Sequence, residues 1–441
     1  METLLSHVSV VTMDERMSVL TDAFLGVEDG KIAWLSKKPP ETEPKQIIDG
    51  TGMVVIPGLI NCHTDLEQTI LRGYGDDCDL PTWLRDRVYA PMENMDDRAA
   101  KASALLGIAE CLRHGVTSVS DLTTHLDAVA QAVSESGIKA NLASAGICLS
   151  DEDFDVETDP ACQTLIQSHE AWHGHDQGRI LIEAGLQGEG TSCYPLWDAM
   201  TEYAVNNSLG LHLNLGQFPG DTEDCLERTG LTEAQVLDCH GLFSARTQAA
   251  HCCGLDAEDL TLLGKRKVSA VCCVTRNQKL GTGQTDVLAM VRAGMNVALG
   301  TDSAAAVGSL DLLQQVRAVA LQAKAQTGKA ETLPASGALL MATGCGARAQ
   351  GRAGECGMIK VGYDADLAML DFTQPHLMPC HDLTAGVVYT ATGRDVCLTM
   401  VRGEILYAAG RYPTIDLSAL MQELTQYAVP TVFHPKEEQE A

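Results

Sequence analysis

The 441-residue sequence predicts an α/β fold, a TIM-like (β/α)8 barrel with a small β-sandwich domain built from both termini. Residues 58–355 alternate short apolar runs with longer helical patterns, and about eight such units suit a closed parallel barrel. Residues 1–57 and 356–441 instead carry short β-like runs between turns, as two halves of one sandwich would. The length accommodates a large barrel and one accessory domain.

The N-terminal part of the sandwich shows a hairpin signal. Two β-like runs, residues 23–27 and 31–35, flank Asp29-Gly30, a pair that favours a tight hairpin turn. Residues 415–428 have apolar side chains at helical spacing and predict a closing helix. The C-terminal part of the sandwich has similar β-like runs at residues 365–370, 398–401 and 405–407.

The barrel begins with the apolar run 54–62, which predicts one buried strand that ends at His63. Helical patterns follow, for example at residues 97–113 and 311–327. A doubly wound sheet is the competing architecture, but no G-x-G-x-x-G motif follows the first strand. Further strand candidates are residues 118–120, 140–143, 180–184, 210–213, 247–250, 269–272 and 296–299.

Composition excludes several classes of function. The chain has 59 acidic and 31 basic residues, a formal net charge of −28, so it would repel nucleic acid and anionic membranes. No apolar stretch is long enough to span a bilayer and no export signal opens the chain, so we expect a cytoplasmic protein. Its 16 cysteines are then expected to be reduced thiols, and adjacent pairs such as Cys252-Cys253 lack the spacing of structural zinc sites.

Metal-binding residue types recur where strands of the predicted barrel end. His63 and Asp65 are two residues apart and therefore face one side of a strand. His212 lies on a later strand, and His251 and Asp302 follow two others. The functional face of a parallel barrel lies at these carboxyl ends, so the five side chains predict one divalent ion: zinc, iron or manganese. Taken singly, each could be a structural histidine or a helix cap.

Five segments in order along the chain resemble known motifs. They are residues 57–65, 71–84, 113–119, 250–252 and 300–305. They resemble, respectively, P-G-[LF]-[IV]-N-x-H-x-H, a lid segment, R-x-G-[TV]-T-[ST]-V, A-H-C and G-T-D-[GS]-A-A of the amidohydrolase superfamily. The resemblance is to its branch of cytosolic deaminases and chlorohydrolases, which act on 5′-methylthioadenosine, S-adenosylhomocysteine, guanine or s-triazines.

The resemblance implies roles for four of these residues. His63, His212 and Asp302 would be metal ligands, and Asp302 would also accept a proton from the metal-bound water. His251 would orient that water or stabilise the developing charge. Zinc is the metal that this resemblance favours, and a homodimer is common in the family.

Four positions depart from the family pattern. Asp65 replaces the second His of H-x-H, and as a carboxylate ligand it would make the metal a weaker Lewis acid. Leu215 replaces the Glu of H-x-x-E, which passes a proton to the substrate, so an acid/base group worth about two to four orders of magnitude in rate is missing. Gln187 and Cys272 stand where the family has two further histidines.

Three more side chains are candidates. Glu183 and Glu189 could replace the missing acid, although Glu183 would otherwise be a barrel-interior charge paired with a base, and Glu189 a solvated loop residue. Trp83, in the lid segment, would stack on a planar substrate or else pack in the core. Trp83 and Gln187 are the predicted substrate-binding residues.

These observations predict a metal-dependent hydrolase that acts, like a deaminase, on a C–N bond other than a peptide bond in a small heterocyclic molecule. The alternative is a catalytically degenerate protein of the same fold that binds a ligand or partner. A third hypothesis, a thiol-based redox or metal-storage protein, has little support because adjacent cysteines rarely form a disulfide or a chelate. The expected partners are a small-molecule substrate and a second copy of the chain.

Overall fold

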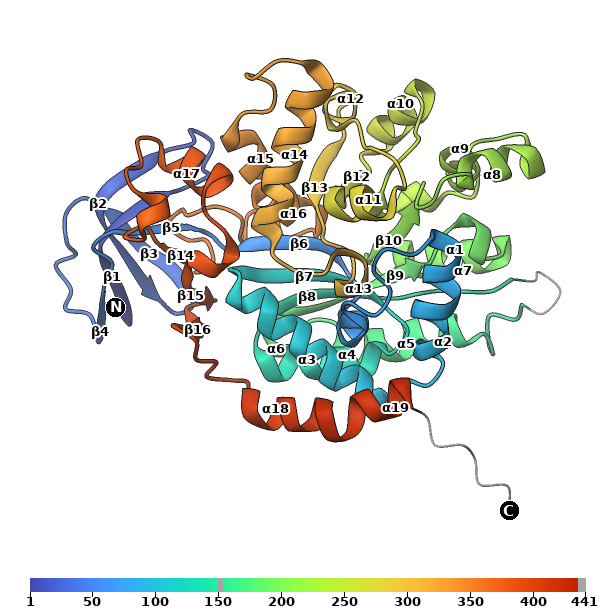
Figure 1. Cartoon of the computed structure of the whole chain (residues 1–441), viewed down its shortest axis with the longest axis horizontal. Coiled ribbons are helices and arrows are strands. Elements are labelled where there is room, and N and C mark those ends of the chain that lie inside the picture. Colours follow the sequence, from blue (N-terminus) through green and yellow to red (C-terminus); the bar gives the residue numbers. More distant parts are fainter. Residues whose placement is uncertain (150–153, 435–441) are drawn as a thin grey trace.

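The computed structural model describes residues 1–149 and 154–434 and confirms the predicted fold class. Eight parallel strands form one sheet in which neighbours follow the sequence, as in a (β/α)8 barrel (Figure 1). They are β6 (Leu59–Thr64), β7 (Val116–Thr123), β8 (Lys139–Ser144), β9 (Ile180–Leu186), β10 (Gly210–Leu215), β11 (Arg246–His251), β12 (Ser269–Cys272) and β13 (Asn296–Leu299). The ends of the sheet meet, because the Asp302 N–H donates to the His63 carbonyl at 2.9 Å.

Helices cover the outside of the barrel (Figure 1). The longest, α3 (Asp97–Arg113), has the predicted bounds, and Asp96 caps it by accepting from the Ala99 N–H. Predicted helix 311–327 appears as α14 (Leu312–Thr327). The others associated with the barrel are α1 (Leu80–Thr82), α2 (Ala90–Met92), α4 (Leu126–Ser136), α5 (Pro160–Trp172), α6 (His175–Gly178), α7 (Tyr194–Asn206), α8 (Asp221–Thr229), α9 (Glu233–Cys239), α10 (Ala257–Arg266), α11 (Val274–Leu280), α12 (Val287–Arg292), α13 (Ala304–Val307), α15 (Ala335–Met341) and α16 (Gly344–Ala349).

The second sheet takes strands from both ends of the chain, as predicted. It contains β1 (Thr3–Val11), β2 (Val19–Glu28), β3 (Lys31–Ser36), β4 (Gln46–Asp49), β5 (Met53–Pro57), β14 (Leu367–Asp371), β15 (Val396–Val401) and β16 (Glu404–Ala408). The Asp29-Gly30 pair joins β2 to β3, with both residues at positive φ, 50° and 73°. A hydrophobic core that includes Leu5, Leu25 and Met400 belongs to this sheet alone.

One expectation is wrong: the apolar run 54–62 does not form a single strand. It is divided at Gly58 into β5 and β6, which belong to different sheets. A Cβ on Gly58 would lie 2.1 Å from the Thr117 Oγ1, so glycine lets the chain pass close to β7 as it leaves one sheet for the other. Hydrophobic periodicity could not reveal this division, because a continuous apolar run suits either one buried strand or two.

A Gly58→Ala variant is expected to lower the free energy of unfolding by about 1–3 kcal/mol, since the added methyl group overlaps the Thr117 side chain. Urea titration would measure this loss. Thr117→Ala removes the two nearest overlapping atoms, so the double variant should be less destabilised than the sum of the single ones. Strictly additive effects would show that the overlap with Thr117 is not the cause.

A buried ion cluster joins the barrel to the second sheet. The Nζ atom of Lys139, at the start of β8, lies 2.7 Å from Asp364 and 2.6 Å from Asp366. All three side chains are buried. Burial opposes the charge on Lys139, but the two carboxylates outweigh it and raise the pKa of Lys139. The cluster therefore stays charged, and it connects β8 to the segment that leads into β14.

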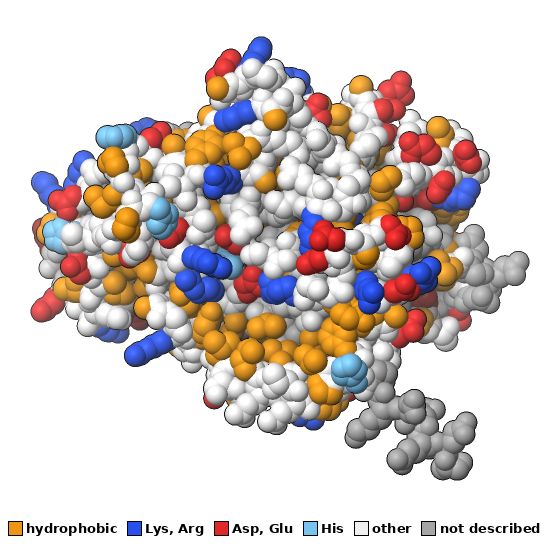
Figure 2. Space-filling view, viewed as in Figure 1, with side chains coloured by type: hydrophobic (Ala, Val, Ile, Leu, Met, Phe, Trp, Pro, Cys, Tyr) orange, Lys and Arg blue, Asp and Glu red, His pale blue; other side chains and the backbone are white. Residues whose placement is uncertain are grey.

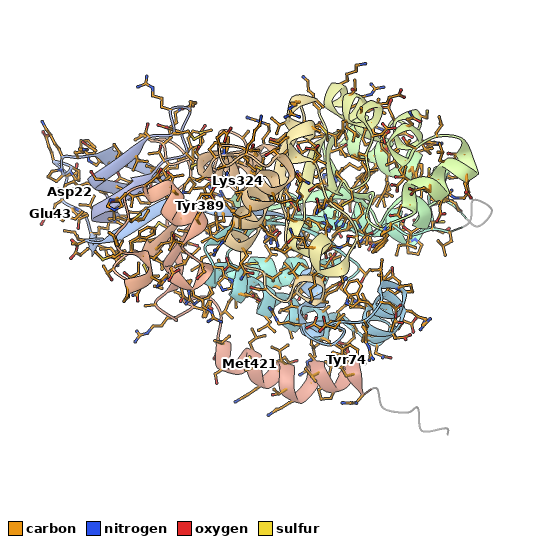
Figure 3. All side chains as sticks on the ribbon, turned by 45° about the horizontal axis from the view of Figure 1, so that its top comes forward. Asp22, Glu43, Tyr74, Lys324, Tyr389 and Met421 are labelled. Carbon is orange, nitrogen blue, oxygen red and sulfur yellow. The ribbon has the colours of Figure 1, made fainter. Side chains whose placement is uncertain are left out.

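The C-terminal residues close the structure along α3. The predicted helix 415–428 is confirmed and extends further, as α18 (Leu417–Glu423), a wider helical turn over Leu424–Ala428, and α19 (Val429–Phe433). Figure 3 labels Tyr74, whose ring contacts that of Phe433 with centroids 4.7 Å apart. Hydrophobic side chains gather on the face where these helices lie (Figure 2).

Lys324 of α14 lies over the ring of Tyr389 in α17 (Leu383–Tyr389), 5.8 Å from its centroid.

Across residues 1–149 and 154–434, we find no helix that is both long and apolar enough to cross a membrane.

Candidate metal centre and adjoining cavity

Three candidate ligands meet at the carboxyl ends of the barrel strands. His63 lies near the end of β6, His251 is the last residue of β11, and Asp302 follows β13. One donor atom from each residue lies within 4.8 Å of the donor atoms of the other two, and all three side chains are buried. Two imidazoles and a carboxylate at this spacing can enclose one divalent ion.

His212, on β10, adjoins the cluster: its Nε2 lies 3.0 Å from the Nδ1 of His63. Within the described part of the chain, neither ring nitrogen of His251 has a hydrogen-bond partner, nor has Nδ1 of His212. A buried polar atom left without a partner costs about 1–3 kcal/mol. These free nitrogen atoms therefore fit a bound metal ion.

Burial keeps the histidines of the cluster in their neutral form. It lowers the pKa of His63 and of His212 to about 3, and it lowers the pKa of His251 well below its usual value. The positive charge of Arg276 acts in the same direction on His63 and His251. Neutral imidazole is the form that binds metals, so all three rings are ready to act as ligands near pH 7.

Two of the clustered residues have strained backbones. His251 and Asp302 adopt φ angles of 70° and 69°, in the left-handed region. A non-glycine residue there costs about 1–2 kcal/mol, and such residues concentrate at functional sites. The Ser303 N–H donates to the Asp302 Oδ1 and so helps to fix this carboxylate.

Asp65 lies beside Asp302 but outside the group of three. Burial, and next the charge of Asp302, raises the pKa of Asp65 well above its usual value. Two adjacent carboxyl groups do not both ionise easily, so a cation bound between them would stabilise their ionised forms. Asp65 therefore adjoins the cluster, and its role as a metal ligand stays a prediction.

Residues 54–406 match the family model of the amidohydrolases, a range that contains all the barrel strands but omits β1 to β4 of the second sheet. The chain belongs to the amidohydrolase family. A 5-methylthioadenosine/S-adenosylhomocysteine deaminase of Moorella thermoacetica is 34% identical over 411 residues, 92% of this chain and 95% of the relative. A 5′-deoxyadenosine deaminase of Methanosarcina acetivorans is 33% identical over 420 residues, 95% of this chain and 96% of the relative.

Solved structures share the fold of this amidohydrolase. An adenosine deaminase from Xanthomonas campestris with bound zinc superimposes with a TM-score of 0.90 at 26% identity, covering 98% of both chains. An atrazine chlorohydrolase from Arthrobacter aurescens, complexed with zinc, has a TM-score of 0.89 at 24% identity and covers 96% of this chain and 99% of its own. At that identity the second comparison shows the fold alone.

Two residues that the sequence comparison places at family acid/base positions, Leu215 and Cys272, hold no proton that can be exchanged near neutral pH. Leu215 is fully buried and packs in the main hydrophobic core. Cys272 is also fully buried, and burial raises the pKa of its thiol to about 12. Neither residue can transfer a proton near neutral pH.

Both candidate replacement acids, Glu183 and Glu189, form ion pairs with an arginine. Glu183 lies inside the barrel with its Oε1 2.8 Å from Arg246, as the structural alternative predicted. The expectation that Glu189 is a solvated loop residue is wrong, because it is 5% exposed and pairs with Arg228. Sequence could not show this pairing, since the two residues lie on different elements.

The predicted substrate-binding residues differ in their positions. Gln187 lines a cavity of about 460 Å³ beside the carboxyl ends of β9 and β10. Trp83 is 6% exposed and packs in the main core. Tyr89, at the end of the same helical segment Trp83–Tyr89, lines the cavity. A stacking role for Trp83 stays a prediction.

Sequence reasoning missed Arg276, a fully buried cation in the site. Its Nε lies 3.1 Å from the Asp302 Oδ2, and its Nη1 donates to the Gln217 carbonyl and the Thr282 Oγ1, both at 2.8 Å. Its guanidinium also lies over the ring of Phe218, 5.1 Å from the centroid. The available signal was its place in residues 272–281, a segment that follows β12 at the functional face of the barrel.

Asp121, at the end of β7, was also missed. Its Oδ1 accepts from the Thr64 Oγ1 at 2.7 Å and from the Leu66 N–H at 2.8 Å, so it holds the backbone on both sides of Asp65. Burial raises the pKa of Asp121 to about 7, and its Oδ2 has no partner in the described structure. A carboxyl group at the end of a barrel strand was the signal that could have identified it.

An Asp121→Asn variant is expected to gain stability relative to wild type as the pH rises from about 4 to 7. The folded protein binds the Asp121 proton more tightly than the unfolded chain, so wild type loses about 1.4 kcal/mol of stability per pH unit in this window while the amide does not. The amide oxygen can keep both accepted hydrogen bonds. Urea titrations of both proteins at several pH values, without metal, would measure the difference. A difference that stays constant with pH would contradict the raised pKa.

Proposed function

We propose that this amidohydrolase is a metal-dependent, deaminase-like hydrolase. It would cleave a C–N bond other than a peptide bond in a small heterocyclic molecule. The observation that carries the proposal is the buried cluster of His63, His251 and Asp302, in which both nitrogen atoms of His251 lack partners among the described residues. Relatives that span more than nine-tenths of the chain are deaminases of adenosine-like compounds, which supports the substrate class.

Zinc is the metal that we propose, because two solved structures of the same fold contain it; iron and manganese suit the same ligand types. His63, His212, Asp65 and Asp302 would hold the ion, and the position of His251 makes it a further candidate ligand. When bound, such an ion makes a water molecule more acidic and polarises the bond to be cleaved.

Side chains of the protein would transfer the proton and stabilise the developing charge. Asp302 would accept a proton from the attacking water at a carboxylate oxygen, and His251 would donate a hydrogen bond to the charge that develops on the substrate. Leu215 provides no proton, so the favoured substrate is one whose leaving group or ring needs none from that position. Gln187 and Trp83 stay the proposed substrate-binding residues.

Metal analysis of protein purified without chelators tests the proposal. We expect close to one zinc ion per chain, lost from a His251→Ala variant and kept by His175→Ala, which changes a half-exposed histidine outside the cluster. Zinc should also raise the melting temperature of the metal-free wild type. Metal-free protein whose melting temperature is unchanged by zinc would contradict the hydrolase and favour the alternative, a degenerate ligand-binding protein. The burial of Leu215 is the observation that supports this alternative.

Restoring the family residues tests how far the substrate has changed. A Leu215→Glu, Asp65→His double variant regains the acid and the second histidine of the family motifs. We expect it to deaminate 5′-deoxyadenosine at least about tenfold faster than wild type, since a positioned acid/base group contributes about 10²–10⁴ in rate. Leu215→Gln with Asp65→His is the matched control without a titrating group. No gain would show that the substrate class itself differs from that of the relatives.

The other partners follow the same reasoning and are proposals. A small-molecule substrate is consistent with the deaminase relatives. Neither nucleic acid nor an anionic membrane suits a net charge of −28. A cytoplasmic homodimer is the assembly that we expect.

A further inference from the structure

The cavity of about 460 Å³ next to the metal centre is markedly acidic. Four carboxylate side chains line it, and the only cationic side chain in its described wall is Arg228, which already pairs with Glu189. The other three carboxylates, Asp221, Asp224 and Glu233, form no ion pair within the described residues. Figure 2 shows acidic side chains on the surface over α8 and α9, the helices that bear these three residues. The cavity wall therefore has more carboxyl groups than cations.

Asn214 gives an independent sign that a ligand belongs here. It follows His212 by two residues on β10, lines the cavity, and is only 4% exposed. Its Nδ2 donates to the Gln187 carbonyl at 2.9 Å, which fixes the orientation of the amide. The Oδ1 then has no hydrogen-bond donor in the described structure. A buried acceptor without a donor costs free energy unless a ligand supplies an N–H or O–H group.

Glu233 sits at the inner wall of the same cavity. Its Oε2 accepts from the Gly216 N–H at 3.0 Å, one residue beyond Leu215, so α9 places a carboxyl group beside the end of β10. Burial, and next the charge of Asp221, raises the pKa of Glu233 to about 8. Glu189 acts in the same direction, and its partner Arg228 is half-exposed at the rim. A cation entering the cavity would favour loss of the Glu233 proton.

The cavity wall also contacts the metal centre. Gln217 and Phe218, which line the cavity, contact Arg276, and Arg276 is paired with Asp302. The cavity wall is thus connected to Asp302 through Arg276.

We propose that this cavity binds a cationic nitrogen group of the substrate, a guanidinium or protonated amine, with Asn214 accepting its hydrogen bond and Asp221 and Glu233 balancing its charge. The position of the reacting bond rests on the proposed function, but binding of the cation does not. The substrate would therefore be a heterocycle or amide that carries a basic side group.

Isothermal titration calorimetry with three matched probes tests this subsite in the full-length protein. Butylguanidinium is expected to bind at least about tenfold more tightly than the neutral isostere butylurea, and pentanoate should bind weakest, because charge decides between them. An Asp221→Asn, Glu233→Gln double variant should lose the preference for the cation. Glu227→Gln, an exposed carboxylate of α8 outside the cavity, should keep it. Equal binding of butylurea, tighter binding of pentanoate, or no binding of butylguanidinium at millimolar concentrations would overturn the proposal.

The pH dependence of binding tests the part played by Glu233. Because its carboxyl group must lose a proton to balance the cation, affinity for butylguanidinium should rise by up to about tenfold per pH unit between pH 6 and 8. Glu233→Gln should abolish that rise while Glu227→Gln keeps it. Binding by wild type that is independent of pH would exclude Glu233 from the subsite. Zinc content and turnover, measured on the same samples, separate failure of the hydrolase proposal from failure of this one.

Discussion

An Asp302→Asn variant is expected to keep the fold and lose at least about 10³-fold in kcat/KM on any compound that the wild type hydrolyses. The carboxylate is buried, adjoins His63 and His251, and is the group proposed to accept the proton of the attacking water. Asparagine has the same shape but can neither accept that proton nor neutralise a cation. Zinc content should fall with activity, and both can be measured on one preparation.

Asp259→Asn provides the matched control. Asp259 is also buried and accepts a hydrogen bond from Thr232, but it lies in α10, outside the cluster. Its replacement should leave zinc content unchanged and kcat/KM within a factor of about two of the wild-type value. Substitutions at sites that share no partners act independently. If Asp302→Asn retained zinc and most of its activity, Asp302 would be neither an essential ligand nor the base.

Replacing Arg276 with methionine is expected to have two opposite effects. Removing one partner of a buried ion pair should lower the free energy of unfolding of the metal-free protein by about 3 kcal/mol or more, because Asp302 loses its counter-charge. Removing a positive charge beside the metal centre should also increase affinity for zinc by about tenfold or more. Urea unfolding without metal and a zinc titration against a competing chelator would measure these effects separately.

Arg266→Met is the comparison for this variant. Arg266 also pairs with a carboxylate, Asp238, but its side chain is 52% exposed, so its loss should have little effect on the free energy of unfolding. Weaker zinc binding by Arg276→Met would reverse the interpretation of Arg276. The guanidinium would then serve chiefly to hold Asp302 in the orientation that binds metal.

Local patterns were sufficient to predict most of the fold. Strands 269–272 and 296–299 and helix 97–113 appear with the predicted bounds, since their apolar periodicity and turn residues agree with their tertiary surroundings. The predicted boundary between residues 57 and 58 coincides with the division at Gly58, but apolar periodicity alone predicted one strand across it. The division depends on how close Thr117 lies in space, and hydrophobic periodicity carries no information about such contacts.

The site was predictable only in part. His63, His251 and Asp302 could be identified because each lies near a strand end and matches a motif. His212 lies within β10, and the structure brings it beside His63. Arg276 and Glu233 could not be identified, because their importance comes from contacts with Asp302 and Gly216 that the fold creates. The roles of all six residues in binding and catalysis stay predictions.

The direct passage from β5 to β6 has a consequence for protein engineering. The strand that carries His63 is joined to the second sheet through Gly58 alone, so exchanging the N-terminal strands of that sheet between relatives would place a junction only a few residues from a proposed metal ligand. Chimeras should therefore inherit β5, Gly58, β6 and the packing partner Thr117 from one parent. A crossover after β7 would keep Gly58 and Thr117 together in the sequence of one parent.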